Sequence, residues 1–283
     1  MTKPQENGRP LRRWWTVRAA AMVSVAALAT TSMPSATASG SAPSTGACRK
    51  PTVALVHGAF TDAGSWHGVI GDLQRHGYQV VAPANPLRGL AADSTYVANV
   101  VRGIKGPVVL AGHSYGGAVI TNAARMAGNV SGLVYVAGFA PDEGESASDI
   151  DRRYPATPLK KSIVPLPHPD GTVDLSIAPE KFPGVFAAGV PRRKAAQMAA
   201  AQRPIAVAAV EGRSGRPAWK ALPSWFLIPT EDQALHPDAQ ADMAERAAAR
   251  RTVRIKAGHA VPVSHPGKVA DLVQAAARGT CAG

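Results

Sequence analysis

The fold is decided by residues 108–117, which read VVLAGHSYGG. The apolar run 108–110 predicts a buried strand, and residues 118–126 predict a helix. A serine that projects above a sheet must lie on a sharp strand-to-helix turn, and small residues two positions before and after it avoid steric clashes there. Gly112 and Gly116 occupy those two positions. The segment therefore predicts Ser114 as a nucleophile at the end of a strand.

Short apolar runs alternate with helix-like patterns on both sides of this segment. Continuous apolar strands that alternate with amphipathic helices are typical of a parallel sheet that is covered on both faces. The predicted fold class is therefore α/β, a mainly parallel sheet of about six strands with helices on both faces. The predicted strands are residues 53–56, 79–82, 108–110, 133–136, 225–228 and 252–255. Helical patterns lie near residues 66–73, 96–104, 118–126, 238–249 and 267–278.

Residues 141–222 interrupt this alternation and are rich in proline, glycine and charge. We interpret them as an inserted, partly helical cap on a core formed by residues 51–140 and 223–283. Within the cap, residues 191–201 contain few helix breakers and favour a helix. Core packing is the alternative role for the apolar side chains of the cap. Those that could line a substrate pocket are Phe182, Phe186, Met198 and Ile205.

The run His57-Gly58-Ala59-Phe60 follows the first predicted strand. A tetrahedral intermediate of acyl transfer needs two backbone N–H donors, one from the residue after the nucleophile and one from a loop after an early strand. We predict that Tyr115 and Ala59 supply them. Gly58 would let this loop approach the serine closely, and Phe60 is a candidate for lining the pocket. An ordinary turn at the end of a strand is the alternative interpretation.

The nucleophile needs a general base, and the base needs an acid that orients it. In this arrangement the acid and then the histidine follow the serine along the chain. His259 follows the last predicted strand, at the carboxyl edge of the sheet, and is the predicted base; His265 is the next candidate. Asp232 follows the fifth predicted strand and is the predicted acid, with the neighbouring Glu231 as its alternative.

Taken together, these segments resemble the α/β-hydrolase superfamily over roughly residues 51–275. Within it, the chain resembles the small bacterial esterases related to plant methyl-ester esterases and hydroxynitrile lyases. The resemblance implies an α/β-hydrolase fold with a Ser114–Asp232–His259 triad that cleaves carboxylic esters. It also implies an oxyanion hole from Ala59 and Tyr115 and a cap that shapes the pocket. The motifs that carry it are residues 56–59, 112–117, 230–232 and 258–259.

Two departures separate this chain from the hydroxynitrile lyases. Those lyases carry a threonine where this chain has Gly58, and a lysine directly after the catalytic histidine, where this chain has Ala260. Cyanohydrin cleavage needs the positive charge of that lysine to stabilise the departing cyanide. The hydrolytic branch is therefore favoured. A serine nucleophile also argues against dehalogenases and epoxide hydrolases, which place an aspartate at that position.

Several activities remain compatible with the same triad. A cofactor-free perhydrolase or haloperoxidase would use it, as would a thioesterase or a peptidase. A ligand-binding protein on a hydrolase scaffold is the alternative from another class. The predicted chemistry requires no metal and no organic cofactor, and the sequence contains no Gly-rich nucleotide loop. The expected partner is a small-molecule ester.

The formal net charge of the 283-residue chain is +12. Its basic residues are scattered in short clusters such as residues 192–194 rather than gathered on one helix with interleaved aromatic side chains. This distribution argues against a nucleic-acid partner.

The N-terminal residues 1–38 predict a signal peptide. A basic start precedes the apolar run 19–29, and the small residues at 36–38 resemble a cleavage site. The apolar run is too short to span a bilayer, so we expect secretion with no stable membrane anchor after cleavage. Residues 39–50 would form a flexible leader. A membrane anchor or a disordered tail is the alternative.

The chain has two cysteines, Cys48 and Cys281, and both lie after the predicted cleavage site. In an oxidising compartment we expect them to form a disulfide that joins the two ends of the mature chain. On the chain-entropy model so long a loop would contribute at most roughly 5 kcal/mol. Two free thiols are the alternative.

Overall fold

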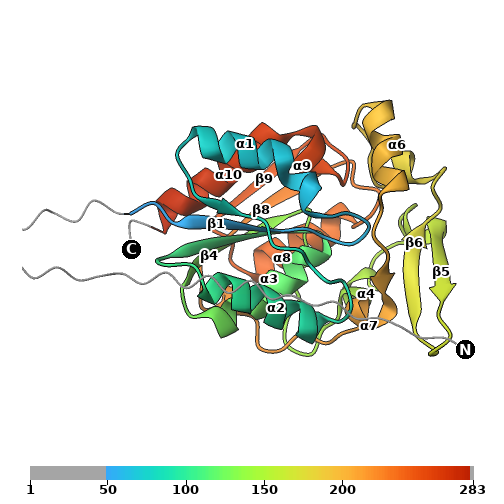
Figure 1. Cartoon of the computed structure of the whole chain (residues 1–283), viewed down its shortest axis with the longest axis horizontal. Helices are drawn as coiled ribbons and strands as arrows, with labels where there is room; N and C mark the ends of the chain where they lie inside the picture. The colour runs from blue at the N-terminus through green and yellow to red at the C-terminus, as the bar shows by residue number, and fades with distance from the viewer. Residues whose placement is uncertain (1–48, 281–283) are drawn as a thin grey trace, which may run out of the picture. The chain divides into compact units, whose positions relative to one another are not determined.

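The computed structural model describes residues 49–280, which form a six-stranded parallel sheet with helices on both faces and a small antiparallel sheet (Figure 1). This architecture confirms the predicted fold class. The predicted signal peptide, most of the predicted leader and both cysteines lie outside the described residues, so those predictions remain predictions. In order across the main sheet, the strands are β2 (Val80–Val81), β1 (Thr52–Val56), β3 (Val108–His113), β4 (Val130–Val136), β8 (Ser224–Pro229) and β9 (Arg251–Ile255).

Both faces of the inner strands β1, β3, β4 and β8 are largely buried, whereas the edge strands β2 and β9 are partly exposed. Successive side chains of a strand point to opposite faces, so Val53 and Leu55 of β1 join one apolar cluster while Ala54 and Val56 join the other. This burial explains why the strands read as continuous apolar runs. One face is covered by α1 (His67–Arg75), α9 (Val261–Ser264) and α10 (Pro266–Gly279). The other is covered by α2 (Leu90–Arg102), α3 (Tyr115–Ala127) and α8 (Pro237–Arg246).

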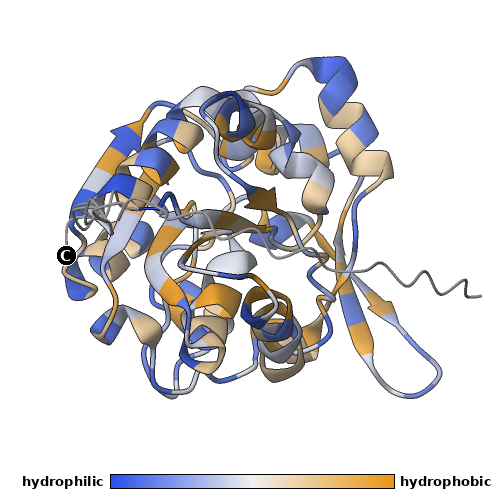
Figure 2. Ribbon diagram, turned by 60° about the vertical axis from the view of Figure 1, so that its left-hand side comes forward, coloured by the Kyte–Doolittle hydropathy of each residue, from blue (hydrophilic) through white to orange (hydrophobic). Residues whose placement is uncertain are grey.

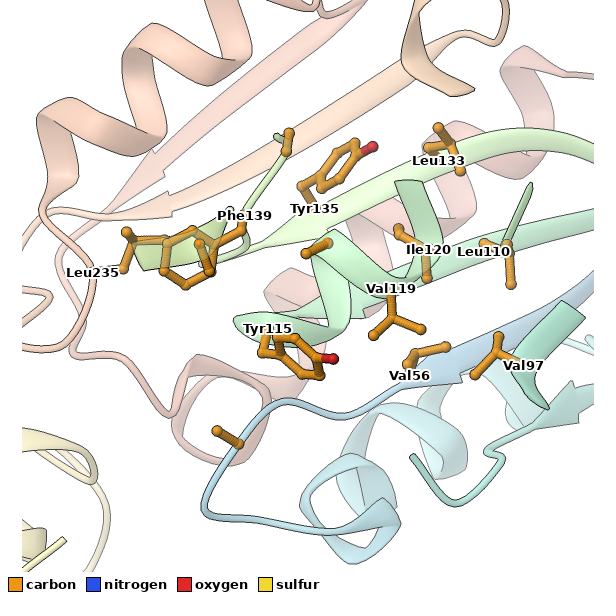
Figure 3. Close-up of a cluster of buried hydrophobic side chains, with 14 of the residues drawn as sticks. Val56, Val97, Leu110, Tyr115, Val119, Ile120, Leu133, Tyr135, Phe139 and Leu235 are labelled. Carbon is orange, nitrogen blue, oxygen red and sulfur yellow. The ribbon is translucent and has the colours of Figure 1, made fainter. Parts of the chain in front are cut away.

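The second face anchors the helix that follows the candidate nucleophile. Figure 3 shows Val119 and Ile120 of α3 among side chains from neighbouring strands, including Val56, Leu110 and Leu133. All five are fully buried, and burying one such side chain contributes roughly 1.5–3 kcal/mol. Figure 2 shows the same separation of buried and exposed residues: hydrophobic residues lie on the strands, and hydrophilic residues lie on the outer sides of helices. Packing of α3 therefore fixes where its first residue lies at the sheet edge.

Residues 141–222, which we interpreted as a cap, hold the antiparallel sheet and several short helices. Helix α6 lies inside the predicted helical stretch 191–201. The sheet β5-β6-β7 was not predicted, because Pro165 and Pro167 of β5 are poor strand residues and β7 has only two residues. The elements are α4 (Ala147–Asp151), η2 (Lys160–Ser162), β5 (Ile163–Pro167), β6 (Val173–Ile177), α5 (Phe182–Val185), α6 (Arg192–Ala200), β7 (Ile205–Ala206), α7 (Val207–Val210) and η3 (Ala218–Lys220).

An ion pair joins this segment to the loop before α2. Nη1 of Arg88 lies 2.9 and 3.0 Å from the two carboxylate oxygens of Asp174 on β6. The second guanidinium nitrogen, Nη2, donates to the Pro204 carbonyl at 3.1 Å, so Arg88 contacts the segment at two points. One short 3-10 helix, η1 (Ala63–Trp66), precedes α1. Along residues 49–280, no helix is long and apolar enough to cross a membrane.

Candidate active site

Ser114 is the single residue between β3 and α3. Its φ of 53° lies in the left-handed region, a conformation that costs a non-glycine residue on the order of 1–3 kcal/mol. Glycine is required at positions 112 and 116, because a side chain at either position would clash with the backbone. A Cβ on Gly112 would lie 2.5 Å from the backbone oxygen of Gly116, and a Cβ on Gly116 would lie 2.4 Å from that of Val56. The strained turn therefore exists only because both positions lack a side chain.

The loop after β1 lies directly against this turn. A Cβ on Gly58 would lie 2.7 Å from Ser114 Cβ and 2.8 Å from the carbonyl oxygen of His113. His57 holds the loop in place, since its Nδ1 lies 2.9 Å from the Gly58 carbonyl oxygen and its Nε2 accepts the Asn85 N–H at 2.9 Å. The proton of the His57 ring therefore sits on Nδ1. Burial lowers the pKa of His57, so this ring is a neutral structural support.

Two backbone N–H groups are available beside Ser114. Within residues 49–280, neither the Ala59 N–H nor the Tyr115 N–H donates a hydrogen bond, whereas the neighbouring Phe60 N–H donates to the Arg203 carbonyl at 3.0 Å. The Tyr115 N–H is free because the first N–H groups of a helix have no intrahelical acceptor. The Tyr115 hydroxyl donates to Oδ2 of Asp93 at 2.8 Å, which fixes the residue.

His259 is hydrogen-bonded to Asp232. Its Nδ1 lies 2.9 and 3.1 Å from the two carboxylate oxygens. The Asp232 side chain is fully buried, and it also accepts the N–H groups of Ala234 and Leu235 and the side-chain amide of Gln240 at 2.8–3.0 Å. So many donors hold a buried carboxylate in one orientation.

The alternative acid, Glu231, points elsewhere. Its side chain is exposed and forms an ion pair with Lys256 at 3.6 Å. The alternative base, His265, has its Nδ1 2.9 Å from the Ser264 hydroxyl and does not line the cavity that contains Ser114. Of the four candidates, the structure brings together Asp232 and His259.

The backbone and ring of His259 are supported by two neighbouring aromatic side chains. Nε2 of His113 donates to the His259 carbonyl at 3.0 Å, and the two ring centroids lie 4.8 Å apart. The Phe186 ring packs against the His259 ring at a centroid distance of 5.1 Å and also contacts His113 at 6.2 Å. The Phe186 carbonyl accepts the Ala260 N–H. Burial, and then the proximity of His259, hold the pKa of His113 well below its usual value. His113 therefore stays neutral.

Ser114 and His259 line the same cavity, which has a volume of about 160 Å³. Their side chains are not hydrogen-bonded to each other in the described residues, which is common for catalytic groups in the absence of substrate.

The prediction that Phe182 lines the cavity is wrong. Phe182 is fully buried behind Phe186, at a ring-centroid distance of 4.9 Å. The predicted residues that do line the cavity are Ala59, Phe60, Ser114, Tyr115, Phe186, Ile205 and His259.

Two residues at this site were not predicted. Gln240 has a signal in the sequence, since it shares a helix face with Met243 and Ala244 and is a polar residue at a buried position. Asp151, the last residue of α4, has no such signal: it lines the cavity only because the cap folds over the sheet edge. Burial raises the pKa of Asp151 to about 6.

Comparison with known proteins identifies the class. The model of the alpha/beta hydrolase family matches residues 53–272, and the chain belongs to this family. Over 105 residues the chain is 32% identical to the "Carbendazim hydrolyzing esterase" of Nocardioides sp. (strain SG-4G). That match covers 32% of this chain and 43% of the relative, so it spans less than half of the relative's length.

Two solved structures are similar over most of the described chain. Polyneuridine aldehyde esterase has a TM-score of 0.70 and 18% identity, with 80% of this chain and 99% of that one covered. A pyrethroid hydrolase from Sphingobium faniae JZ-2 has a TM-score of 0.67 and 20% identity, with 81% and 97% covered. At such identities the likeness establishes the fold. The predicted resemblance to the α/β-hydrolase superfamily is confirmed.

Proposed function

We propose that this chain is a serine hydrolase that cleaves carboxylic esters through an acyl-enzyme on Ser114. One observation carries the proposal: the ring of His259 is hydrogen-bonded to a buried carboxylate and lines the same cavity as a strained serine. A serine, a histidine and an acid in this order form a general-base system that activates the hydroxyl. The free N–H groups of Ala59 and Tyr115 support the proposal, since they can stabilise an oxyanion.

The proposed reaction begins when Ser114 Oγ attacks the ester carbonyl carbon and its proton passes to Nε2 of His259. Asp232 keeps the other ring proton on Nδ1 and stabilises the imidazolium that forms. The Ala59 and Tyr115 amides donate to the developing oxyanion, each contributing about 3 kcal/mol to the barrier reduction.

The tetrahedral intermediate then collapses as the C–O bond to the alcohol breaks, and His259 returns its proton to the leaving oxygen. A water molecule that is deprotonated by His259 attacks the acyl-enzyme. Cleavage of the acyl–Ser114 bond restores the serine hydroxyl and releases the carboxylic acid.

The two departures from the hydroxynitrile lyases support hydrolysis rather than cyanohydrin cleavage. Ala260 is 1% exposed and its N–H is held by the Phe186 carbonyl, so the place that a lysine would occupy is filled by buried core. The close approach of Gly58 to Ser114 excludes a threonine at that position without movement of the loop.

The cavity favours a small ester. Its volume of about 160 Å³ is close to the roughly 150 Å³ of an engineered cavity that binds benzene. Side chains such as Phe60, Phe139, Leu159 and Phe186 make its wall mainly apolar. The names of the similar proteins support an ester substrate. Two of them are esterases, named for carbendazim and for polyneuridine aldehyde, and the third is a pyrethroid hydrolase.

A fluorophosphonate probe tests the proposed nucleophile. The probe should modify one serine, identified as Ser114 by peptide mass spectrometry, and the Ser114→Ala variant should not be modified. Ser148 also lines the cavity, so Ser148→Ala is the matched control and should still be labelled at position 114. A folded wild-type protein that is not labelled would indicate a binding protein instead of an enzyme.

A chain-length series tests the size of the substrate. With p-nitrophenyl esters, we expect kcat/KM for the acetate and butyrate to exceed that for the dodecanoate by at least about tenfold, since one apolar pocket contributes only about 1–3 kcal/mol to discrimination. A preference for the dodecanoate would contradict the small cavity. Thioesters and peracid formation, measured in parallel, separate the alternative activities of the same triad.

Export is a further part of the proposal and is supported by the sequence of residues 1–38 alone. N-terminal sequencing of protein collected from the culture medium should begin at Ser39. Protein that is retained in the cell with an intact N-terminus would contradict export.

A further inference from the structure

One carboxylate that borders the cavity has no partner in the part of the chain that the structure describes. Within residues 49–280, the side chain of Asp151 makes neither a hydrogen bond nor an ion pair. The other acids of this part of the cap are paired. Asp149 accepts the Ser146 N–H at 3.0 Å and pairs with Arg152, and Glu145 lies 2.8 Å from Arg246. Asp151 therefore differs from its neighbours in having a free carboxylate that borders the cavity.

The charged groups near Asp151 do not neutralise it. Lys160 lines the same cavity but is exposed and lies beyond ion-pair distance. Arg152 points to Asp149, and His259 is bonded to Asp232. Burial raises the pKa of Asp151 to about 6, with Lys160 and His259 lowering it and Asp232 raising it, so the carboxylate is ionised at pH 8.

An unpaired carboxylate in an apolar cavity is unfavourable until an opposite charge or a hydrogen-bond donor reaches it. The rest of the wall is apolar except for Ser114, Ser148, Lys160 and His259. We propose that Asp151 binds a protonated amine of the substrate, which makes small amino-substituted esters the preferred substrate class. This inference rests on the proposed esterase function. The ring or chain of such an ester would occupy the apolar wall while its ammonium group faces Asp151.

Binding without turnover tests the site independently of catalysis. In the Ser114→Ala protein at pH 8, benzylammonium and benzyl alcohol have the same ring and nearly the same size, and they differ in charge. Calorimetry should give benzylammonium about tenfold to a hundredfold tighter binding, the range expected for a hydrogen bond to a charged group. The added change Asp151→Asn should bring the two affinities within about threefold. Equal affinities for the two ligands, or a ratio that Asp151→Asn leaves unchanged, would overturn the proposal.

Two further variants sharpen this measurement. Lys160→Met removes the nearest cation on the cavity wall and should increase the ratio of the two affinities. Asp271→Asn is the matched control, because Asp271 is an exposed carboxylate on α10 that does not line the cavity, and it should leave the ratio unchanged. A control that lowers the ratio as much as Asp151→Asn would show a general charge effect and would also overturn the proposal.

Matched esters test the substrate class. The p-nitrophenyl esters of β-alanine and butyric acid differ by an ammonium group in place of a methyl group. Wild-type kcat/KM should favour the β-alanine ester, and Asp151→Asn should remove the preference. If the butyrate is hydrolysed and Ser114 is labelled but no preference appears, the amine site is wrong and the esterase stands. If benzylammonium binds through Asp151 but neither ester is hydrolysed, the esterase is wrong and the amine site stands.

Discussion

Two carboxylates lie near His259, one from the core and one from the cap, and their surroundings are opposite. Asp232, from the loop after β8, accepts donors from His259, Ala234, Leu235 and Gln240. Asp151, from the end of α4, accepts none in the described chain. In the proposed esterase, the core edge fixes the orientation of the general base, and the cap presents an unpaired carboxylate to a ligand.

The two carboxylates differ in preorganisation, which is how far their hydrogen bonds are formed before a ligand binds. A buried carboxylate with every lone pair engaged cannot reorient, which is what a residue that orients a general base requires. A carboxylate without partners gains its hydrogen bonds only when a ligand enters, which is what recognition requires.

The largest expected effect is at Asp232. Asp232→Asn should lower kcat/KM for p-nitrophenyl acetate by about 10⁴-fold, because an amide favours the wrong tautomer of the histidine. Asp238→Asn, an exposed carboxylate at the start of α8, is the matched control and should keep wild-type activity. A loss smaller than about tenfold at position 232 would mean that this carboxylate does not orient the base.

The approach of the oxyanion loop gives the next effect. Gly58→Thr places a Cβ at 2.7 Å from Ser114 Cβ, so the loop must move away from the serine. A displacement of about 1 Å costs roughly a hundredfold in rate, and we expect kcat to fall at least that far. Gly184→Ala in α5, where a Cβ meets nothing within 4 Å, should be active. Full activity of Gly58→Thr would show that catalysis does not require the close approach of this loop to Ser114.

Gln240 should have a moderate effect. Gln240→Leu removes one donor from Asp232, and loss of a hydrogen bond to a charged group should lower kcat by about tenfold or more. The rate is taken per fluorophosphonate-labelled site, so misfolded protein does not contribute. Gln197→Leu makes the same change on the exposed side of α6. If both variants keep their kcat, Gln240 does not position Asp232.

The smallest effect is on stability, at Asp151. Its folded pKa of about 6 lies above the ordinary value of 3.8, so the favourable contribution of the protonated form is complete below pH 4 and is lost as the pH rises through 6. Asp151→Asn should therefore stabilise the fold at pH 8, by about 1–3 kcal/mol. The gain should shrink toward pH 4. Denaturant unfolding at both pH values measures it, and a pH-independent difference would show that the carboxylate is not desolvated.

Much of the core could be predicted because it obeys local rules. Each predicted strand overlaps a strand of the sheet, and the glycines at 112 and 116 are needed where the pattern placed them. The position of Asp232 and His259 after successive strands brings them to one sheet edge, since parallel strands end on the same side.

The cap could not be predicted in the same way. Its sheet depends on long-range pairing, in which residue 163 lies opposite 177 and residue 175 opposite 205. Proline in β5 conceals the strand signal. Phe182 and Phe186 were equivalent in the sequence, and only packing shows that one covers the cavity and the other lies behind it. Asp151 was missed for the same reason.

In the proposed mechanism Ser114 carries the acyl group during turnover. An acid quench of the wild-type protein during hydrolysis of p-nitrophenyl butyrate, followed by peptide mass spectrometry, tests this step. We expect a butyryl group on the peptide that contains Ser114, at a level that rises and falls with substrate. Turnover with the acyl group on another residue, or turnover in full by Ser114→Ala, would contradict it.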